Sequence, residues 1–208
     1  MKIKLLFLIF LFSCKVPLFA QSPSAQDIIE IAKAGSLHYL DKIPTGQETH
    51  YGFNNRNECK IAVPGIPFHV FILSTEFFSD TGLVNNNYLV PTDEWRVTLT
   101  VNDEPRVMIT VAKVNGILQV AGIGASGLAS ELGAFGKKNP GMIRNGIILR
   151  VLNLDCEFLV IPGKKINNGS STYFLKSSSI VFGQPNDHQT SFSLNHVLTL
   201  IKNKTANK

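Results

Sequence analysis

The sequence is poor in the residues from which a metal centre is built. It has three cysteines and five histidines in 208 residues, and neither type shows the close Cys-x-x-Cys or His-x-x-x-His spacing that zinc sites use. The histidines are spread along the chain at His38, His50, His69, His188 and His196. We therefore predict no metal site and no bound cofactor.

Long apolar runs and an excess of one charge are also lacking. No stretch reaches the roughly 18 apolar residues of a transmembrane helix, so we expect no membrane-spanning segment in the mature protein. The 20 basic residues include Lys2, Lys4 and Lys15, and setting these three aside leaves 17 against 15 acidic residues, a net charge of +2. A charge this small argues against nucleic acid as a partner.

The first twenty residues indicate export. Lys2 and Lys4 precede the apolar stretch Leu5–Ser13, which is too short to cross a hydrocarbon core of roughly 30 Å as a helix. The small residue Ala20 stands where a signal peptidase would cleave. We predict a signal peptide over residues 1–20 and a periplasmic or secreted protein.

Residues 21–208 contain no repeat, low-complexity block or linker, so we expect a single globular domain. An alternative processing site lies within the leader, because Leu11–Cys14 resembles a lipobox. Acylation of Cys14 would make the protein a lipoprotein, which touches the membrane only through its lipid anchor.

Cleavage after Ala20 leaves two cysteines, Cys59 and Cys156. In an oxidising compartment they could form one disulfide, which would close a long loop and stabilise the fold by up to about 4–5 kcal/mol. The alternative is that each is a buried, inert thiol. The sequence leaves both possibilities open.

Three segments have the pattern of helices. Residues 24–35 carry an apolar stripe, with Ser24 and Asp27 placed for a capping box and Gly35 placed to end the helix. A short central helix is expected over 125–135 and a C-terminal helix over 194–202.

The clearest strands form an antiparallel meander near 94–121. The expected strands are 94–101, 106–114 and 117–121. Inward apolar side chains recur at every second residue of the first two, and Asn115-Gly116 before the third is a strong hairpin signal. Other strands are expected at 68–74, at 147–161 (one bent strand or two), at 173–175 and 180–182, and around 51–53 and 60–63. The predicted fold class is α+β, with helices packed on a mainly antiparallel sheet.

Two glycine-rich motifs overlap after this meander. Gly122–Gly127 matches G-x-G-x-x-G, but it follows an antiparallel strand and the next suitable acid, Asp155, lies too far along for a dinucleotide site. Ser126 resembles the serine of a nucleophile elbow, although Leu128 stands where that turn needs a small residue. We interpret the segment as a tight strand-to-helix turn that needs a positive φ and brings the helix close to the sheet.

Four aromatic residues are the most favoured binding feature in the sequence. Phe77, Phe78, Tyr88 and Trp95 flank the loop 79–94, and loops of this length are often functional. Exposed together they would form an aromatic binding patch; otherwise each packs in the core.

We therefore predict an exported, non-enzymatic module that binds a protein, a peptide or an envelope component through a sheet face, a sheet edge or the segment 76–94. One alternative is an exported hydrolase with a serine or cysteine nucleophile that spacing does not locate. The other is a lipid-anchored structural protein of the envelope. Of these, an enzyme is the less favoured interpretation.

Overall fold

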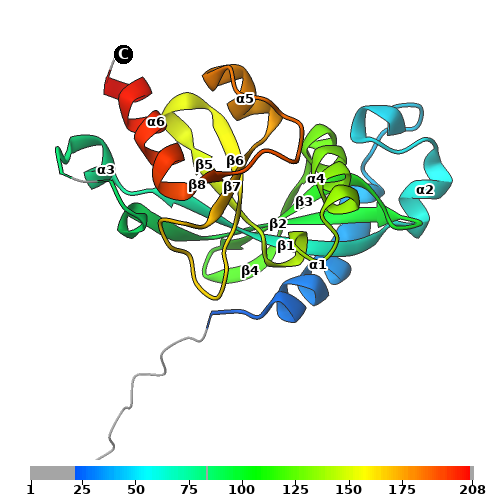
Figure 1. Ribbon diagram of the computed structural model, residues 1–208. Coiled ribbons are helices and arrows are strands. Elements are labelled where there is room, and N and C mark those ends of the chain that lie inside the picture. Colours follow the sequence, from blue (N-terminus) through cyan, green and yellow to red (C-terminus); the bar gives the residue numbers. More distant parts are fainter. Residues whose placement is uncertain (1–21, 83, 207–208) are drawn as a thin grey trace, which may run out of the picture.

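The computed structural model describes residues 22–82 and 84–206 (Figure 1). The helices are α1 (Ala25–Leu40), α2 (Arg56–Ile61), α3 (Thr75–Ser79), α4 (Ser126–Lys138), α5 (Lys176–Phe182) and α6 (Leu194–Ala206). Short 3-10 turns are η1 (Glu48–Tyr51), η2 (Asn86–Tyr88), η3 (Ile143–Asn145) and η4 (Leu152–Leu154). The strands are β1 (Val63–Leu73), β2 (Leu89–Val101), β3 (Glu104–Val114), β4 (Ile117–Gly124), β5 (Ile147–Val151), β6 (Cys156–Ile161), β7 (Ser171–Phe174) and β8 (Phe192–Ser193).

All of these strands belong to one eight-stranded sheet in the order β4-β3-β2-β1-β5-β6-β7-β8. Every neighbouring pair is antiparallel except β1 and β5, which pair in parallel through His69–Ile72 and Ile147–Arg150. The α+β class and the meander β2-β3-β4 are confirmed. The stretch 147–161 is two strands, because η4 and the left-handed Asp155 (φ 48°) turn the chain between them.

The helices cover separate parts of the sheet. The cluster under α1 holds the inward side chains of β2 and β3, and the cluster under α6 holds those of β5, β6 and β7. The cluster under α4 takes the opposite side chains, such as Met108 of β3 and Ile148 of β5. In Figure 1, β5 to β7 rise steeply from the flatter strands β1 to β4, and α4 lies within the angle. Helix α4 therefore packs on both halves of the sheet.

Helix α1 runs past the predicted end at Gly35. Its capping box at Ser24 and Asp27 is present, but the helix continues to Leu40. A Cβ atom on Gly35 would lie 2.5 Å from Cγ2 of Val120. Glycine is needed there because the helix backbone approaches β4 closely, so it marks a packing contact and does not end the helix.

Two groups of predicted strands are wrong. Residues 180–182 lie in α5, because Ser178 hydrogen-bonds Leu175 at the helix start and the left-handed Gly183 ends it. The segments 51–53 and 60–63 fall largely in turns and helix: η1 closes at Gly52 (φ 84°), and α2, capped by Asn55, runs to Ile61. Local capping prevails over the strand propensity of short apolar runs.

Cys59 and Cys156 are both buried, and no disulfide joins them. Cys59 lies on α2 in the cluster under α1, and Cys156 begins β6 in the cluster under α6. The disulfide is therefore absent, because the two thiols belong to different clusters of the core. This agrees with the alternative of two inert thiols.

The predicted signal peptide over 1–20 and the lipidation site Cys14 lie outside the described residues. Among the helices that the structure does describe, none is both long and apolar enough to cross a membrane.

Candidate functional site

Two hollows lie beside α4. The first, which we call the Glu131 pocket, has a volume of about 670 Å³ and lies between α4, α5 and the segment that follows α5. The second, the β1-edge groove, has a volume of about 710 Å³ and runs along the first half of β1. Both volumes fall in the range of ligand sites, roughly 300–1,000 Å³.

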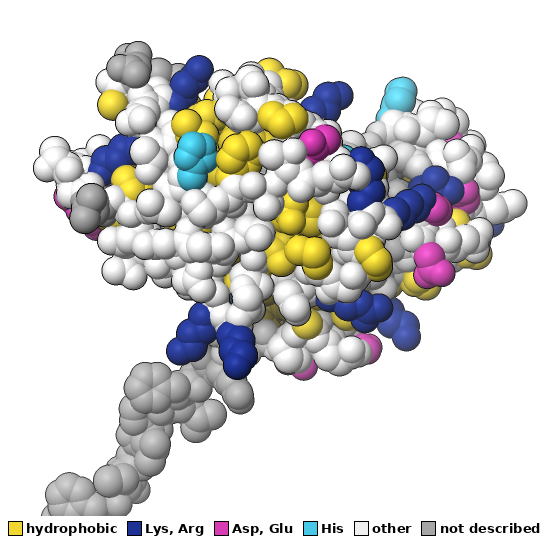
Figure 2. All heavy atoms as spheres, viewed as in Figure 1, with side chains coloured by type: hydrophobic (Ala, Val, Ile, Leu, Met, Phe, Trp, Pro, Cys, Tyr) yellow, Lys and Arg dark blue, Asp and Glu magenta, His cyan; other side chains and the backbone are white. Residues whose placement is uncertain are grey.

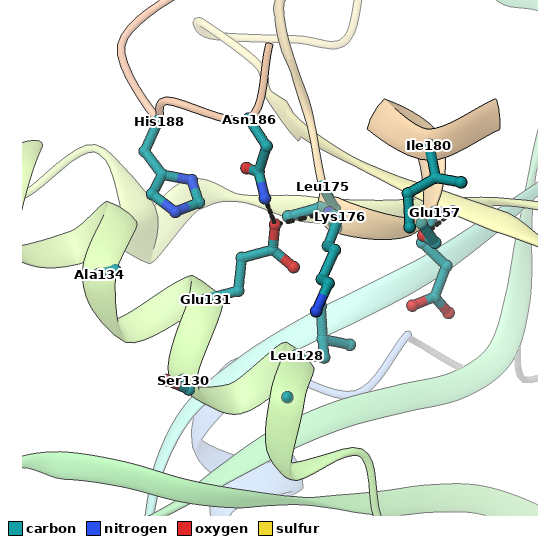
Figure 3. A pocket seen from close by; sticks show the side chains of 12 residues that line it. Leu128, Ser130, Glu131, Ala134, Glu157, Leu175, Lys176, Ile180, Asn186 and His188 are labelled. Atoms are coloured by element: carbon teal, nitrogen blue, oxygen red, sulfur yellow. Dashed lines mark hydrogen bonds between the residues drawn. The ribbon is translucent and has the colours of Figure 1, made fainter. Parts of the chain in front are cut away.

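Titratable and polar side chains converge on the Glu131 pocket (Figure 3). Glu131 projects from α4, Lys176 from the start of α5, Glu157 from β6, and Asn186 and His188 from the segment after α5. Oε1 of Glu131 accepts hydrogen bonds from the backbone N–H of Lys176 at 2.6 Å and from Nδ2 of Asn186 at 2.7 Å. One carboxylate oxygen thus ties three segments of the chain together.

The electrostatics of Glu131 are unusual for a helix side chain. Burial raises the pKa of its carboxyl group above the ordinary value, and the negative charge of Glu157 adds to the rise. The two hydrogen bonds and the positive charge of Lys176 oppose it without cancelling it. A carboxyl with a raised pKa inside a pocket is a mark of functional sites.

The segment that carries Asn186 and His188 is held by hydrogen bonds from the end of α4 and by others within the segment. Lys138 and Asn139, at the end of α4, donate hydrogen bonds to the backbone carbonyls of Asp187 (2.7 Å) and His188 (2.9 Å). The Asp187 carboxylate accepts three hydrogen bonds, two from the hydroxyl and backbone N–H of Thr190 and one from the backbone N–H of Gln189. These hydrogen bonds lower the pKa of Asp187 to about 2.

The backbone at His188 adopts a conformation that residues with a Cβ atom rarely take. Its φ of 60° is left-handed, a conformation that costs a residue with a Cβ about 1–2 kcal/mol. Burial lowers the pKa of its imidazole, with Lys138 contributing and Asp187 opposing. The surrounding hydrogen bonds therefore hold a strained residue with its ring over the pocket.

We expect Glu131→Gln to raise the melting temperature at neutral pH. Gln keeps the Oε1 acceptor but removes a charge that the fold disfavours. Because the folded-state pKa is raised, the stability linked to the protonated carboxyl is full in acid and is lost as the pH rises through that pKa. Each kcal/mol gained in unfolding free energy should raise the melting temperature by about 2–4 °C. Calorimetry should show this increase at neutral pH and none at acidic pH. A lower melting temperature at neutral pH would contradict it.

The β1-edge groove follows an unpaired strand edge. β1 begins at Val63, but it pairs with β5 only from His69 onward. Six consecutive residues of β1, Val63 to Phe68, line the groove. Because side chains alternate between the two faces of a strand, a hollow lined by every residue in succession follows the edge of β1. Thr98 and Thr100 also line it, so it extends over the adjoining face of β2.

Apolar groups from three elements form the groove walls. Leu132 and Gly136 of α4 line one side, Ile143 lies next to them, and Ala25 and Ile29 of α1 line the other. Figure 2 shows hydrophobic side chains gathered in the middle of the view, over β1 and between α4 and α1. Val63 keeps 56 % of its surface exposed there, so the groove leaves apolar surface in water.

A ladder of charges crosses the sheet next to the Glu131 pocket. Arg150 of β5 donates two hydrogen bonds to Glu94 of β2, at 3.0 and 3.1 Å, and one to Glu157 of β6 at 3.0 Å. Arg96 adds a contact of 2.9 Å to Glu94. Glu157 therefore enters the pocket with its charge balanced by Arg150.

The predicted aromatic residues are only partly brought together. The Phe77 ring contacts those of Phe78 and Tyr88, with centroid separations of 5.1 and 5.5 Å. Phe77 is fully buried, and Nζ of Lys202 lies 5.7 Å from its ring centroid. Trp95 lies apart, 7 % exposed and stacked on His69 at 4.6 Å. Only Phe78 and Tyr88 keep substantial exposure, so the four do not form one surface.

The glycine-rich motif proves to be a turn at the edge of the sheet. Gly122 and Gly124 end β4, which is antiparallel to β3. A Cβ on either glycine or on Gly127 would meet nothing within 4 Å. The left-handed residue of the turn is Ala125 (φ 57°), which corrects the expectation that the glycines supply the positive φ and the close helix approach.

Neither hollow was predictable from the local sequence. By its sequence pattern, Glu131 is an ordinary polar residue of a helix. The first residues of β1 contain Pro64 and Pro67, a pattern typical of a turn. In the described residues no three His, Cys, Asp or Glu side chains lie together in a way that could hold a metal ion.

The fold and these two hollows define an α+β protein whose central helix borders both candidate sites. Comparison with known proteins adds nothing to this: no protein-family model, no curated protein and no solved structure matches the chain. The functional argument therefore rests on the geometry.

Proposed function

We propose that this protein is an exported, non-enzymatic binding module that takes an extended peptide segment of a partner along the open edge of β1. The observation that carries the proposal is the run of six consecutive β1 residues, Val63 to Phe68, that line a groove and have no strand partner on that side among the described residues. Export is proposed from the sequence of residues 1–20.

An extended chain is the occupant that fits this groove best. The backbone groups along an unpaired strand edge are hydrogen-bonding groups that a second strand satisfies at the right spacing. Pro64 and Pro67 have no N–H to offer, so backbone pairing alone is limited and the apolar walls must contribute much of the affinity. Apolar side chains of the peptide would pack against Leu132 and Ile143.

Arg144, Lys137 and Asp103 are the charged residues that line the groove, and of these Arg144 is the one that could receive a carboxylate of a bound peptide. Arg144 is exposed at the rim, and within the described residues it has no ion-pair partner. Lys137, the other basic residue of the groove, is already paired with Glu104 at 2.7 Å. We therefore expect Arg144 to pair with a carboxylate of the bound segment.

The test is selection of random linear peptides displayed on phage against the folded protein. We expect enriched peptides that combine apolar residues with an acid and that shift the backbone amide signals of Val63, Gly65 and Ile66. Ala25→Trp, which fills the groove from an exposed position, should weaken binding by about tenfold or more, equivalent to about 1.4 kcal/mol. Arg144→Glu should weaken the acidic peptides.

The matched control is Gln26→Trp, one residue along α1, exposed and outside the groove. It should bind the selected peptides as the parent protein does. The proposal fails if no peptide is enriched, or if Ala25→Trp and Gln26→Trp affect binding equally.

The two alternatives differ in their support. A thiol hydrolase needs an accessible cysteine, whereas Cys59 and Cys156 are 2 % and 1 % exposed. Ser126 stands at the start of α4, and no histidine hydrogen-bonds its hydroxyl within the described residues. A lipid anchor on Cys14 would be compatible with the binding role, since it would fix the same module to a membrane.

A further inference from the structure

We propose a second binding site: the Glu131 pocket takes a hydroxyl-rich ligand of the saccharide class. This site is separate from the β1-edge groove and does not depend on the proposed peptide-binding function. It lies on the other side of α4, between that helix and α5. The proposal rests on the free polar groups of the pocket, its charge balance and its apolar walls.

The pocket presents hydrogen-bonding groups that the fold does not use. Glu131 engages Oε1 and Asn186 engages Nδ2, which leaves Oε2 and Oδ1 as acceptors. Nζ of Lys176 and the ring nitrogens of His188 have no hydrogen-bond partner among the described residues, and Figure 3 shows both side chains beside Glu131. Acceptors and donors therefore line the same cavity.

A hydroxyl group matches this mixture because it donates and accepts at once. A carboxylate such as that of Glu131 accepts from a hydroxyl, while an ammonium such as that of Lys176 donates to one. An amine ligand would satisfy only the acceptors, and an acid ligand only the donors.

The charge balance of the pocket points the same way. Glu157 is paired with Arg150 at 3.0 Å, so its carboxylate does not require a cationic ligand. The charge of Glu131 is opposed by that of Lys176. The facing groups thus sum to a site near neutrality, which suits an uncharged polar molecule.

Apolar side chains line the remaining surface. Leu128 and Leu175 form part of the wall, and Ile180 stands at the rim with 75 % of its surface exposed. These groups can cover the C–H faces of a sugar ring. Among the residues that the structure describes, no Phe, Tyr or Trp lines the pocket, so we expect weak binding in the millimolar range.

The experiment is a titration of the full domain with free trisaccharides of glucose, galactose or N-acetylglucosamine, followed by backbone amide NMR. We expect at least one of them to shift signals of Glu131, Lys176 and His188. Ser130→Trp, at an exposed position of the pocket, should abolish the shifts, whereas Gln189→Trp, exposed and outside it, should not. Glu131→Gln should weaken binding by about tenfold, because it removes a charge-assisted hydrogen bond.

Three results would overturn the saccharide assignment. One is the absence of shifts with every trisaccharide, and another is an equal effect of Ser130→Trp and Gln189→Trp. The third is a stronger response of the same signals to putrescine, which would make the ligand a cation. Ala25→Trp separates the two proposals, since it should leave saccharide shifts unchanged while it blocks peptide binding.

Discussion

Gly52→Ala is expected to lower the free energy of unfolding by about 3 kcal/mol, the sum of backbone strain and a steric clash. Gly52 ends η1 with a φ of 84°. A Cβ atom there would lie 2.2 Å from the backbone carbonyl oxygen of Arg106 and 2.9 Å from Cβ of Ser126. Neither neighbour is the flexible end of a side chain, so β3 or the start of α4 must move.

Gly116→Ala is the matched control for this substitution. Gly116 has a φ of 83°, but a Cβ there would meet nothing within 4 Å. It should therefore show only the cost of the left-handed backbone, about 1–2 kcal/mol. Urea denaturation of both variants separates strain from clash, and equal losses of stability would show that the contact at Gly52 relaxes without cost.

Arg150→Met is expected to cost about 2 kcal/mol at neutral pH, the value of hydrogen bonds to charged groups reduced for partial exposure. Arg150 makes three hydrogen bonds to two carboxylates, those of Glu94 and Glu157. The side chains keep about a fifth of their surface in water (20 %, 24 % and 21 %), so solvent screens part of the interaction. Methionine preserves the apolar stem and removes the charge.

The dependence of this effect on pH has a defined sign. Burial would raise the pKa of Glu94, but hydrogen bonds and charge from Arg150 and Arg96 overcome it and lower the pKa. The stabilisation is therefore full above the usual carboxyl pKa and is lost as the pH falls through the lowered value. The difference between Arg150→Met and the parent should shrink in acid, whereas Arg144→Met, at an exposed position, should differ little at any pH. A pH-independent difference would mean that the lost stability comes from packing.

Those parts of the fold that depend on local pattern were predictable. The alternation along β2 and β3 and the Asn115-Gly116 turn specify the meander, and Ser24 and Asp27 specify the start of α1. The parallel pairing of β1 with β5 joins segments far apart in the sequence, and no local signal announces it. Gly35 shows the same limit, because the need for glycine there comes from its close contact with Val120 of β4.

The candidate sites were not predictable for a related reason. The raised pKa of Glu131 depends on its burial and on the charge of Glu157. Its hydrogen-bond partners Lys176 and Asn186 come from segments 45 and 55 positions further along. The open edge of β1 exists only because β5 begins late in the register, at His69. Both are consequences of where distant segments meet.

The late pairing of β1 also matters while the chain is being synthesised. β2 follows β1 closely, but Ile147–Arg150 emerge from the ribosome only after β4 and α4, so the second edge of the nascent β1 stays open in the meantime. An open edge is a template for aggregation with other chains. Pro64 and Pro67 lie in the part that the finished protein leaves open, and proline offers no N–H to an intruding strand. The two prolines thus limit strand pairing where β1 stays open, whereas His69–Ile72 has no such protection until β5 arrives.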